Sequence, residues 1–219
     1  MNLEGLNEKQ KQAVLHKNGP LLVLAGAGSG KTRVLTTSIA NLIENENIDP
    51  RNILAITFTN KAANEMKDRI ANLLNMDVSH LWIGTFHSIC ARILRMNIEK
   101  LGYTSNFTIY DTNDQRTLIK DIINELGYKD DISPRSAQNL ISSLKNKSIS
   151  PKEFLTIDGY YQNQNEYYEI YKLYEKRKFE YNALDFDDLI EKVLDLFSKD
   201  KESLEYYQHK FSYVYVDEY

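Results

Sequence analysis

Apolar and polar positions alternate in two different ways along the first hundred residues. Short continuous apolar runs predict buried strands at 21–25, 53–58 and 81–84. Between these runs, apolar residues recur at helical spacing and predict helices at 31–44, 61–74 and 85–101. Because strands and helices alternate, the sequence predicts a parallel sheet that is covered by helices on both faces.

The pattern changes after about Asn106. Between Asp111 and Tyr207 no run is typical of a strand, and capping residues with helical spacing predict helices. These helices are expected at 111–126, 133–145, from 150 onward, 163–181 and 185–197. Strand character returns at 211–216. We therefore expect an α/β domain made of residues 1–108 and 208–219, with a helical domain of residues 109–207 inserted in it.

Composition adds limits to this picture. The chain has 219 residues, of which 42% are hydrophobic and 26% are charged, as is typical of soluble globular proteins. No apolar run approaches the roughly 20 residues that a membrane helix needs, and the amino terminus lacks the layout of a secretory signal. Cys90 is the single cysteine, expected to be buried, so we expect a reducing, cytoplasmic setting. The net charge of −4 argues against coating duplex DNA, but it permits single-strand binding.

The strongest chemical signal is a glycine-rich turn between the first predicted strand and helix. Residues 25–32 read Ala-Gly-Ala-Gly-Ser-Gly-Lys-Thr, the form of a phosphate-binding loop with alanine in place of the first glycine. Backbone N–H groups, the positive end of a helix dipole and the Lys31 ammonium would face a polyphosphate. Thr32 would offer its hydroxyl to Mg²⁺. The alternative is an ordinary strand–turn–helix corner.

A second signal is the acidic pair that follows the last predicted strand. Phosphoryl hydrolysis needs a carboxylate that holds the metal and a group that orients water. Asp217 and Glu218 would supply these two functions. Alone, the pair is equally typical of a solvated strand end. A third acidic group, Asp185, Asp187 and Asp188, opens a predicted helix, and structural capping is favoured there over a metal site.

These residues resemble those of the UvrD/Rep-type superfamily 1 DNA helicases. The likeness runs through six motifs in order: the Q motif at 6–14, motif I at 25–33, motif Ia at 56–63, motif Ib at 84–88, the tract that ends the inserted helical domain at 184–189, and the start of the Asp-Glu-Tyr-Gln-Asp motif at 216–219. The resemblance implies a P-loop NTPase (RecA-like) parallel-sheet domain with an inserted all-helical subdomain, and the fragment is cut before the glutamine of motif II.

For the nucleotide, the resemblance implies ATP and Mg²⁺ as cofactors. Lys31 and Glu218 would be catalytic, and Thr32 and Asp217 would hold the metal. The nucleotide-binding set would be Gln10, Ala25, Gly26, Ala27, Gly28, Ser29, Gly30, Lys31, Thr32 and Arg33. Gln10 would read adenine, although its side chain is also suited to cap the first helix. Arg33 would lie beside the base or the phosphates, or in solvent.

For nucleic acid, the resemblance implies contacts at the ends of two strands. The set is Phe58, Thr59, Asn60, Lys61, Thr85, Phe86 and His87. Phe58 would stack on or wedge against a base of single-stranded DNA, and the polar members would contact sugar and phosphate. From the residues alone, Phe58 is also suited to the core, Thr85 to a helix cap, and His87 to a half-buried position.

The resulting hypothesis is the amino-terminal motor fragment of an ATP-dependent 3′→5′ DNA helicase, acting on single strands or single-strand/duplex junctions, with no membrane partner. We expect its missing carboxyl-terminal helicase domains to supply the arginines of the opposite cleft wall, so the fragment alone would bind ATP weakly and hydrolyse little. Three alternatives stay open: the front end of a recombination-type helicase–nuclease subunit, a P-loop small-molecule kinase, and a helical insertion that docks proteins.

Overall fold

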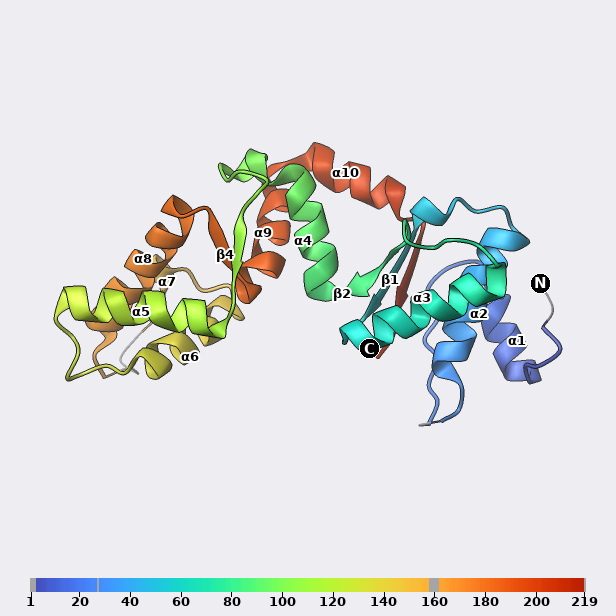
Figure 1. Ribbon diagram of the computed structural model, residues 1–219, viewed down its shortest axis with the longest axis horizontal. Helices are drawn as coiled ribbons and strands as arrows, with labels where there is room; N and C mark the ends of the chain where they lie inside the picture. Colours follow the sequence, from blue (N-terminus) through green and yellow to red (C-terminus); the bar gives the residue numbers. More distant parts are fainter. Residues whose placement is uncertain (1–2, 27, 158–161, 219) are drawn as a thin grey trace. The chain divides into compact units, whose positions relative to one another are not determined.

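A computed structural model describes residues 3–26, 28–157 and 162–218 (Figure 1). The chain forms two compact units, one of Met1–Ile89 with Leu204–Tyr219 and one of Cys90–Ser203. We call them the sheet unit and the helical unit. The chain passes between them inside helix α4 (Phe86–Asn97) and again inside α10 (Lys201–Lys210).

The sheet unit contains a three-stranded parallel sheet. Its strands are β1 (Ile53–Thr57), β2 (Trp82–Thr85) and β5 (Tyr213–Val216), in the order β2-β1-β5. Ala55 in the centre pairs with Ile83 on one side and Tyr215 on the other. All residues of β1 and β2 are buried, which confirms the predicted parallel strands at these positions. In β5 only alternate residues are half-buried. The prediction that both faces of the sheet are covered therefore holds for β1 and β2 but not for β5.

Three helices complete the sheet unit before α4. They are α1 (Glu8–Val14), α2 (Lys31–Glu44) and α3 (Asn60–Leu74), with a 3₁₀ turn at Pro50–Asn52. Ile39 and Leu42 of α2 and Met66 and Ile70 of α3 pack with the strands in one apolar cluster. The helix predicted at 31–44 is therefore confirmed with the same bounds, because its apolar residues recur at the spacing that one buried face requires.

The strand predicted at 21–25 was wrong. This segment has no ladder partner among the described residues, and its apolar side chains stay exposed, from 41% for Val23 to 86% for Leu24. An apolar run forms a buried strand only where a neighbouring strand supplies hydrogen bonds, and within the described residues β5 pairs with β1 alone. The pattern of residues reports hydrophobicity but not the presence of that neighbour.

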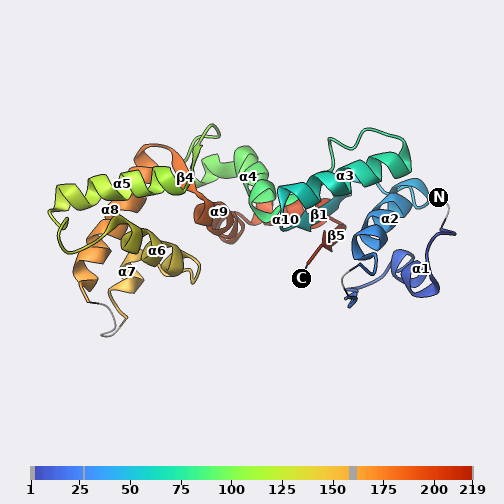
Figure 2. The same cartoon turned by 60° about the horizontal axis from the view of Figure 1, so that its bottom comes forward.

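The helical unit is built mainly from helices around its own core. They are η2 (Ile98–Leu101), α5 (Thr112–Leu126), α6 (Pro134–Lys145), α7 (Pro151–Phe154), α8 (Gln164–Glu180) and α9 (Phe186–Lys199). Helices α5, α6 and α8 pack around a buried apolar cluster (Figure 2). Tyr171 and Tyr174 of the tyrosine-rich α8 belong to it, so their rings pack in the core of this unit.

The expectation that residues 111–207 contain no strand was also wrong. Strand β4 (Ala183–Asp185) pairs in parallel with β3 (Thr108–Tyr110), with Ile109 opposite Leu184. Three residues are too few to give a period in the sequence, and the pairing partner lies far away along the chain. Cys90 on α4 is partly rather than fully buried, and burial raises the pKa of its thiol to about 11.

Local capping explains where the helices begin. Reciprocal side-chain and backbone hydrogen bonds join Asn7 to Gln10, Asp111 to Asp114, Ser150 to Glu153, and Asp185 to Asp188. Each pair satisfies N–H groups that the first helical turn leaves without a partner.

Candidate functional site

The glycine turn leads into α2 with backbone conformations that glycine favours. Gly28 and Gly30 have φ values of 73° and 87°, in the left-handed region. Gly30 is the N-cap of α2 and has no side chain to accept a hydrogen bond from its first turn. The N–H groups in the first turn of α2 therefore have no side-chain cap and are available as donors for an anion. Ala27 of the predicted set lies outside the described residues.

Lys31 folds back over this turn. Its Nζ donates to the carbonyl oxygens of Ala25 at 2.7 Å and Gly26 at 2.9 Å. Among the described residues, no ion pair includes Lys31. Ser29 closes the turn by donating its hydroxyl to the Gly26 carbonyl at 2.7 Å. The turn thus places one positive charge beside the uncapped N–H groups in the first turn of α2, an arrangement that suits a phosphate group.

Asp217 follows β5 at the carboxyl edge of the sheet. Its backbone N–H donates to the Ile56 carbonyl at 2.8 Å and so continues the β5–β1 ladder. Burial raises the pKa of Asp217, the neighbouring Glu218 raises it further, and the positive charge of Lys31 lowers it. Lys31 and Asp217 are therefore electrostatic neighbours although they lie far apart in sequence. Glu218 is exposed, with φ of 64°.

Gln10 performs the capping function and also contacts the glycine turn. Its Oε1 accepts from the Asn7 backbone N–H at 3.0 Å, and its Nε2 donates to the Ser29 carbonyl at 3.0 Å. A Cβ added to Gly30 would lie 3.1 Å from Gln10 Nε2. The first helix and the turn are consequently in contact through this glutamine, and glycine at position 30 keeps the approach open.

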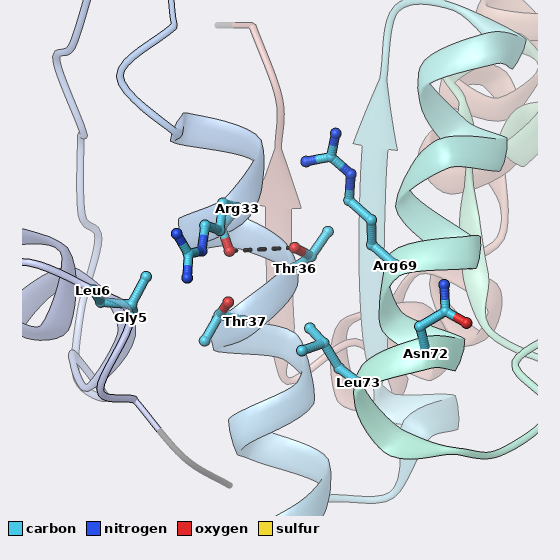
Figure 3. Close-up of a pocket in the computed structure, with 8 residues that line it drawn as sticks. All are labelled: Gly5, Leu6, Arg33, Thr36, Thr37, Arg69, Asn72 and Leu73. Carbon is cyan, nitrogen blue, oxygen red and sulfur yellow. Dashed lines mark hydrogen bonds between the residues drawn. The ribbon is translucent and has the colours of Figure 1, made fainter.

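A cleft of about 330 Å³ lies between the segment before α1 and helices α2 and α3. Figure 3 shows its residues: Gly5 and Leu6 before α1, Arg33, Thr36 and Thr37 on α2, and Arg69, Asn72 and Leu73 on α3. Arg33, the last residue of the predicted nucleotide set, and Arg69 enter from different helices. Sequence reasoning missed Arg69. The only signal was its spacing with Asn72 and Leu73, which places the three on one helical face.

The predicted nucleic-acid residues gather at the same sheet edge. Thr57 at the end of β1 pairs with Thr85 at the end of β2, so the residues that follow them are neighbours. Phe58 is 78% exposed and Phe86 45% exposed, which excludes Phe58 from the core. Thr59 accepts a hydrogen bond from the Ala62 N–H at 3.1 Å and thereby caps α3.

The remaining members of this set lie around the caps. The Thr85 hydroxyl oxygen accepts from the Ser88 N–H at 3.2 Å, so the helix-cap interpretation of Thr85 is confirmed. His87 is half-buried, as the alternative interpretation expected. Asn60 begins α3, and the exposed Lys61 lies 4.0 Å from Glu65. The edge therefore presents an exposed aromatic ring on each of two adjacent strand ends.

The acidic group at the start of α9 belongs to the helical unit and is structural. Asp185 is the N-cap and shares a capping box with Asp188, which confirms the capping interpretation for these two. Glu175, Asp185 and Asp188 approach one another closely enough to suggest a metal site. However, the ammonium groups of Lys145 and Lys178 contact them and supply the positive charge instead. Asp187 is a half-exposed residue of the first turn.

Fold and site together define a mixed α/β protein with parallel sheets, a glycine-rich turn before a helix, and an acidic strand end nearby. The family model described as UvrD/REP helicase N-terminal domain matches residues 6–219, and the chain belongs to this family. No helix within the described residues is long and apolar enough to span a membrane.

Curated relatives agree with this assignment. The chain is 49% identical over 218 residues to the ATP-dependent DNA helicase PcrA of Bacillus subtilis, covering 99% of this chain and 29% of the relative. It is 45% identical over 218 residues to PcrA of Staphylococcus aureus (strain Mu50) and 44% identical to PcrA of Staphylococcus epidermidis (strain RP62A), in each case covering 99% of this chain and 30% of the relative. The chain thus spans about 30% of the length of these relatives.

Proposed function

We propose that this chain is the amino-terminal ATP-binding part of an ATP-dependent DNA helicase that moves 3′→5′ along single-stranded DNA. The observation that carries the proposal is the position of Lys31. Its ammonium is held by two backbone carbonyl oxygens, lacks an ion-pair partner among the described residues, and acts electrostatically on Asp217. A cation kept in this state is ready to bind an anionic ligand.

In this proposal the ATP phosphates bind over the glycine turn. The N–H groups of the turn and the first turn of α2 donate to phosphate oxygens, and Lys31 turns from its carbonyl partners to the outer phosphates. Gln10 and Arg33 bind the base, with Arg33 in the cleft beside the turn. RecA-like character for residues 1–108 with 208–219, and a separate inserted helical subdomain at 109–207, are part of the same proposal.

The residues at the sheet edge fit a divalent cation. Burial and Glu218 both disfavour the ionised form of Asp217, and a bound cation would relieve that cost. Thr32 and Asp217 would hold Mg²⁺, which would supply positive charge to neutralise the phosphate groups. Glu218 would accept a proton from the attacking water.

Single-stranded DNA would cross the carboxyl edge of the sheet. The exposed rings of Phe58 and Phe86 offer faces for bases, and Lys61, with Asn60 beside it, offers charge and hydrogen bonds to phosphate and sugar. Strand β1 pairs with β2 at Thr57–Thr85 and with β5 at Ile56–Val216, so in this proposal β1 connects the nucleotide site to the DNA edge. Closure against domains outside this chain is needed for turnover, so the chain alone would hydrolyse ATP little.

The test is ATP hydrolysis by the full-length protein that carries this chain, with and without single-stranded DNA. We expect Lys31→Ala to lower the turnover number by about 100-fold or more, the scale of a lost charge at a transition state. Lys17→Ala is the matched control, because Lys17 is an exposed lysine of the same unit, paired with Glu46 at 2.7 Å. DNA-stimulated hydrolysis by Lys31→Ala at the wild-type rate would refute the proposal.

A further inference from the structure

Three elements that carry proposed site residues meet at one buried serine. Ser38 lies on α2 and is 5% exposed. Its hydroxyl donates to the Val14 carbonyl of α1 at 3.3 Å, and its Oγ lies 2.9 Å from the Tyr215 hydroxyl of β5. Helix α1 bears Gln10, helix α2 bears Lys31, and strand β5 leads to Asp217.

The direction of these hydrogen bonds follows from their chemistry. A carbonyl oxygen can only accept, so the single proton of Ser38 is used on Val14. Tyr215 must then donate its own proton to Ser38 Oγ. The result is a directed chain from Tyr215 through Ser38 to Val14.

The positions of Ser38 and Tyr215 match those of the proposed site residues. Ser38 follows Lys31 by seven residues, two helical turns, so both lie on one face of α2. Tyr215 precedes Asp217 by two residues, so both point to one side of β5. The Ser38–Tyr215 contact therefore joins the helix face that carries Lys31 to the strand face that leads to Asp217.

The Val14 carbonyl, the last acceptor in this series of hydrogen bonds, fixes the position of helix α1. The Val14 carbonyl lies in the last turn of α1, where carbonyl groups have no partner within the helix. Ser38 satisfies this group one turn away from Gln10. Strand β5 depends on such a contact more than β1 does, because β1 is its only ladder neighbour in the described part of the sheet.

We propose that Ser38 and Tyr215 are positioning residues that set the spacing of Lys31 and Asp217 around the bound nucleotide and metal. This inference rests on the proposed function. If β5 shifts or α2 turns slightly, Asp217 and Lys31 no longer reach the same phosphate–metal group. Ser38 is buried and the Tyr215 hydroxyl is held against it, so both groups act through the residues they place.

The experiment uses Tyr215→Phe in the full-length protein and measures ATP hydrolysis against Mg²⁺ concentration. We expect the Mg²⁺ concentration for half-maximal rate to rise, and the turnover number to fall, each by roughly five- to tenfold, as loss of one hydrogen bond and a small misplacement imply. Tyr213→Phe is the matched control: Tyr213 lies on the same side of β5 and its hydroxyl is not part of the Ser38 chain. It should leave both values unchanged.

A second variant approaches the contact from the other side. Ser38→Ala should produce the same shift in Mg²⁺ dependence. The double variant should shift it little further, because both substitutions remove the same Ser38–Tyr215 hydrogen bond. If Tyr215→Phe matches Tyr213→Phe in Mg²⁺ dependence, the inference is wrong, whatever the melting temperatures. This failure differs from failure of the proposed function, in which Lys31→Ala itself would retain full activity.

Discussion

The surroundings of two lysines, one in each unit, show that this chain uses positive charge in two different ways. Lys31 in the sheet unit donates to backbone carbonyl oxygens on an exposed turn. Lys178 in the helical unit is 1% exposed, and its Nζ lies 2.8 Å from Asp185, 2.5 Å from Asp188 and 2.8 Å from Glu175. One lysine therefore has polar contacts without a counter-ion among the described residues, while the other has three.

The difference follows from the cost of burying charge. A buried ammonium must be paired with carboxylates and hydrogen bonds. Otherwise the ammonium would lose its proton on burial, or the protein would not fold. Burial alone would lower the pKa of Lys178, yet Glu175, Asp188 and Asp185 raise it well above its ordinary value. An exposed ammonium needs no such partner, so Lys31 can stay available for a ligand. The buried cluster of paired charges serves the fold, whereas Lys31, which has no ion-pair partner among the described residues, is the lysine that we propose binds the nucleotide.

The largest effect is expected on removing one buried cation. Lys178→Met should lower the free energy of unfolding by about 3–5 kcal/mol, because it leaves buried carboxylates short of a counter-ion. Urea unfolding of the chain, followed by far-ultraviolet circular dichroism, measures this loss. Lys176→Met is the control on the same helix, since Lys176 is 68% exposed and lies 3.7 Å from Glu180. Equal stability of the two variants would contradict the structural role of the cluster.

A smaller effect is expected from the acid side of the same cluster. Burial by itself would raise the pKa of Asp185, but Lys178 and Lys145 outweigh it, and the pKa lies below its ordinary value. A carboxyl with a lowered folded pKa stabilises the protein above its unfolded pKa of about 3.9 and loses that contribution as the pH falls further.

Asp185→Asn should therefore be less stable than the wild-type chain by about 2–3 kcal/mol at pH 7, and the difference should shrink below about pH 4. Urea midpoints between pH 3 and pH 7 measure this dependence. Asp187→Asn, which changes a half-exposed neighbour on the first turn of α9, should show a small difference that does not vary with pH. If the stability difference between Asp185→Asn and the wild-type chain did not change with pH, the charge of Asp185 would not be what stabilises the cluster.

The smallest effect on stability is expected at Lys31. Lys31→Ala should change the free energy of unfolding by less than about 0.5 kcal/mol, although the same substitution is expected to lower the turnover number for ATP hydrolysis by about 100-fold or more. The same urea titration tests it. A loss as large as that of Lys178→Met would mean that Lys31 serves the fold, and the contrast between the two lysines would disappear.

Helices and their starting points could be predicted because their signals are local. The cap at Asp185 and the apolar face of residues 31–44 are both contained in the segments they describe. The failed strand at 21–25 and the missed strand Ala183–Asp185 have the opposite cause. Whether a segment forms a strand depends on a partner that lies elsewhere in the chain.

The same reasoning separates the site residues that sequence patterns find from those they miss. The glycine turn and the acidic pair are short motifs, each read from consecutive residues. Arg69 in the cleft, the buried Lys178 and the link between Ser38 and Tyr215 depend on tertiary packing. Ser38 and Tyr215 are separated by more than half of the chain, so only the folded structure shows that they are in contact.

The central claim is that Lys31 and Asp217 belong to one Mg²⁺–nucleotide site. Equilibrium binding of a non-hydrolysable ATP analogue to the full-length protein, with and without Mg²⁺, tests it most directly. We predict that Mg²⁺ strengthens binding about tenfold or more in the wild-type protein. Asp217→Asn should lose this gain, whereas Lys31→Ala should weaken binding under both conditions. An undiminished effect of Mg²⁺ in Asp217→Asn would contradict the claim.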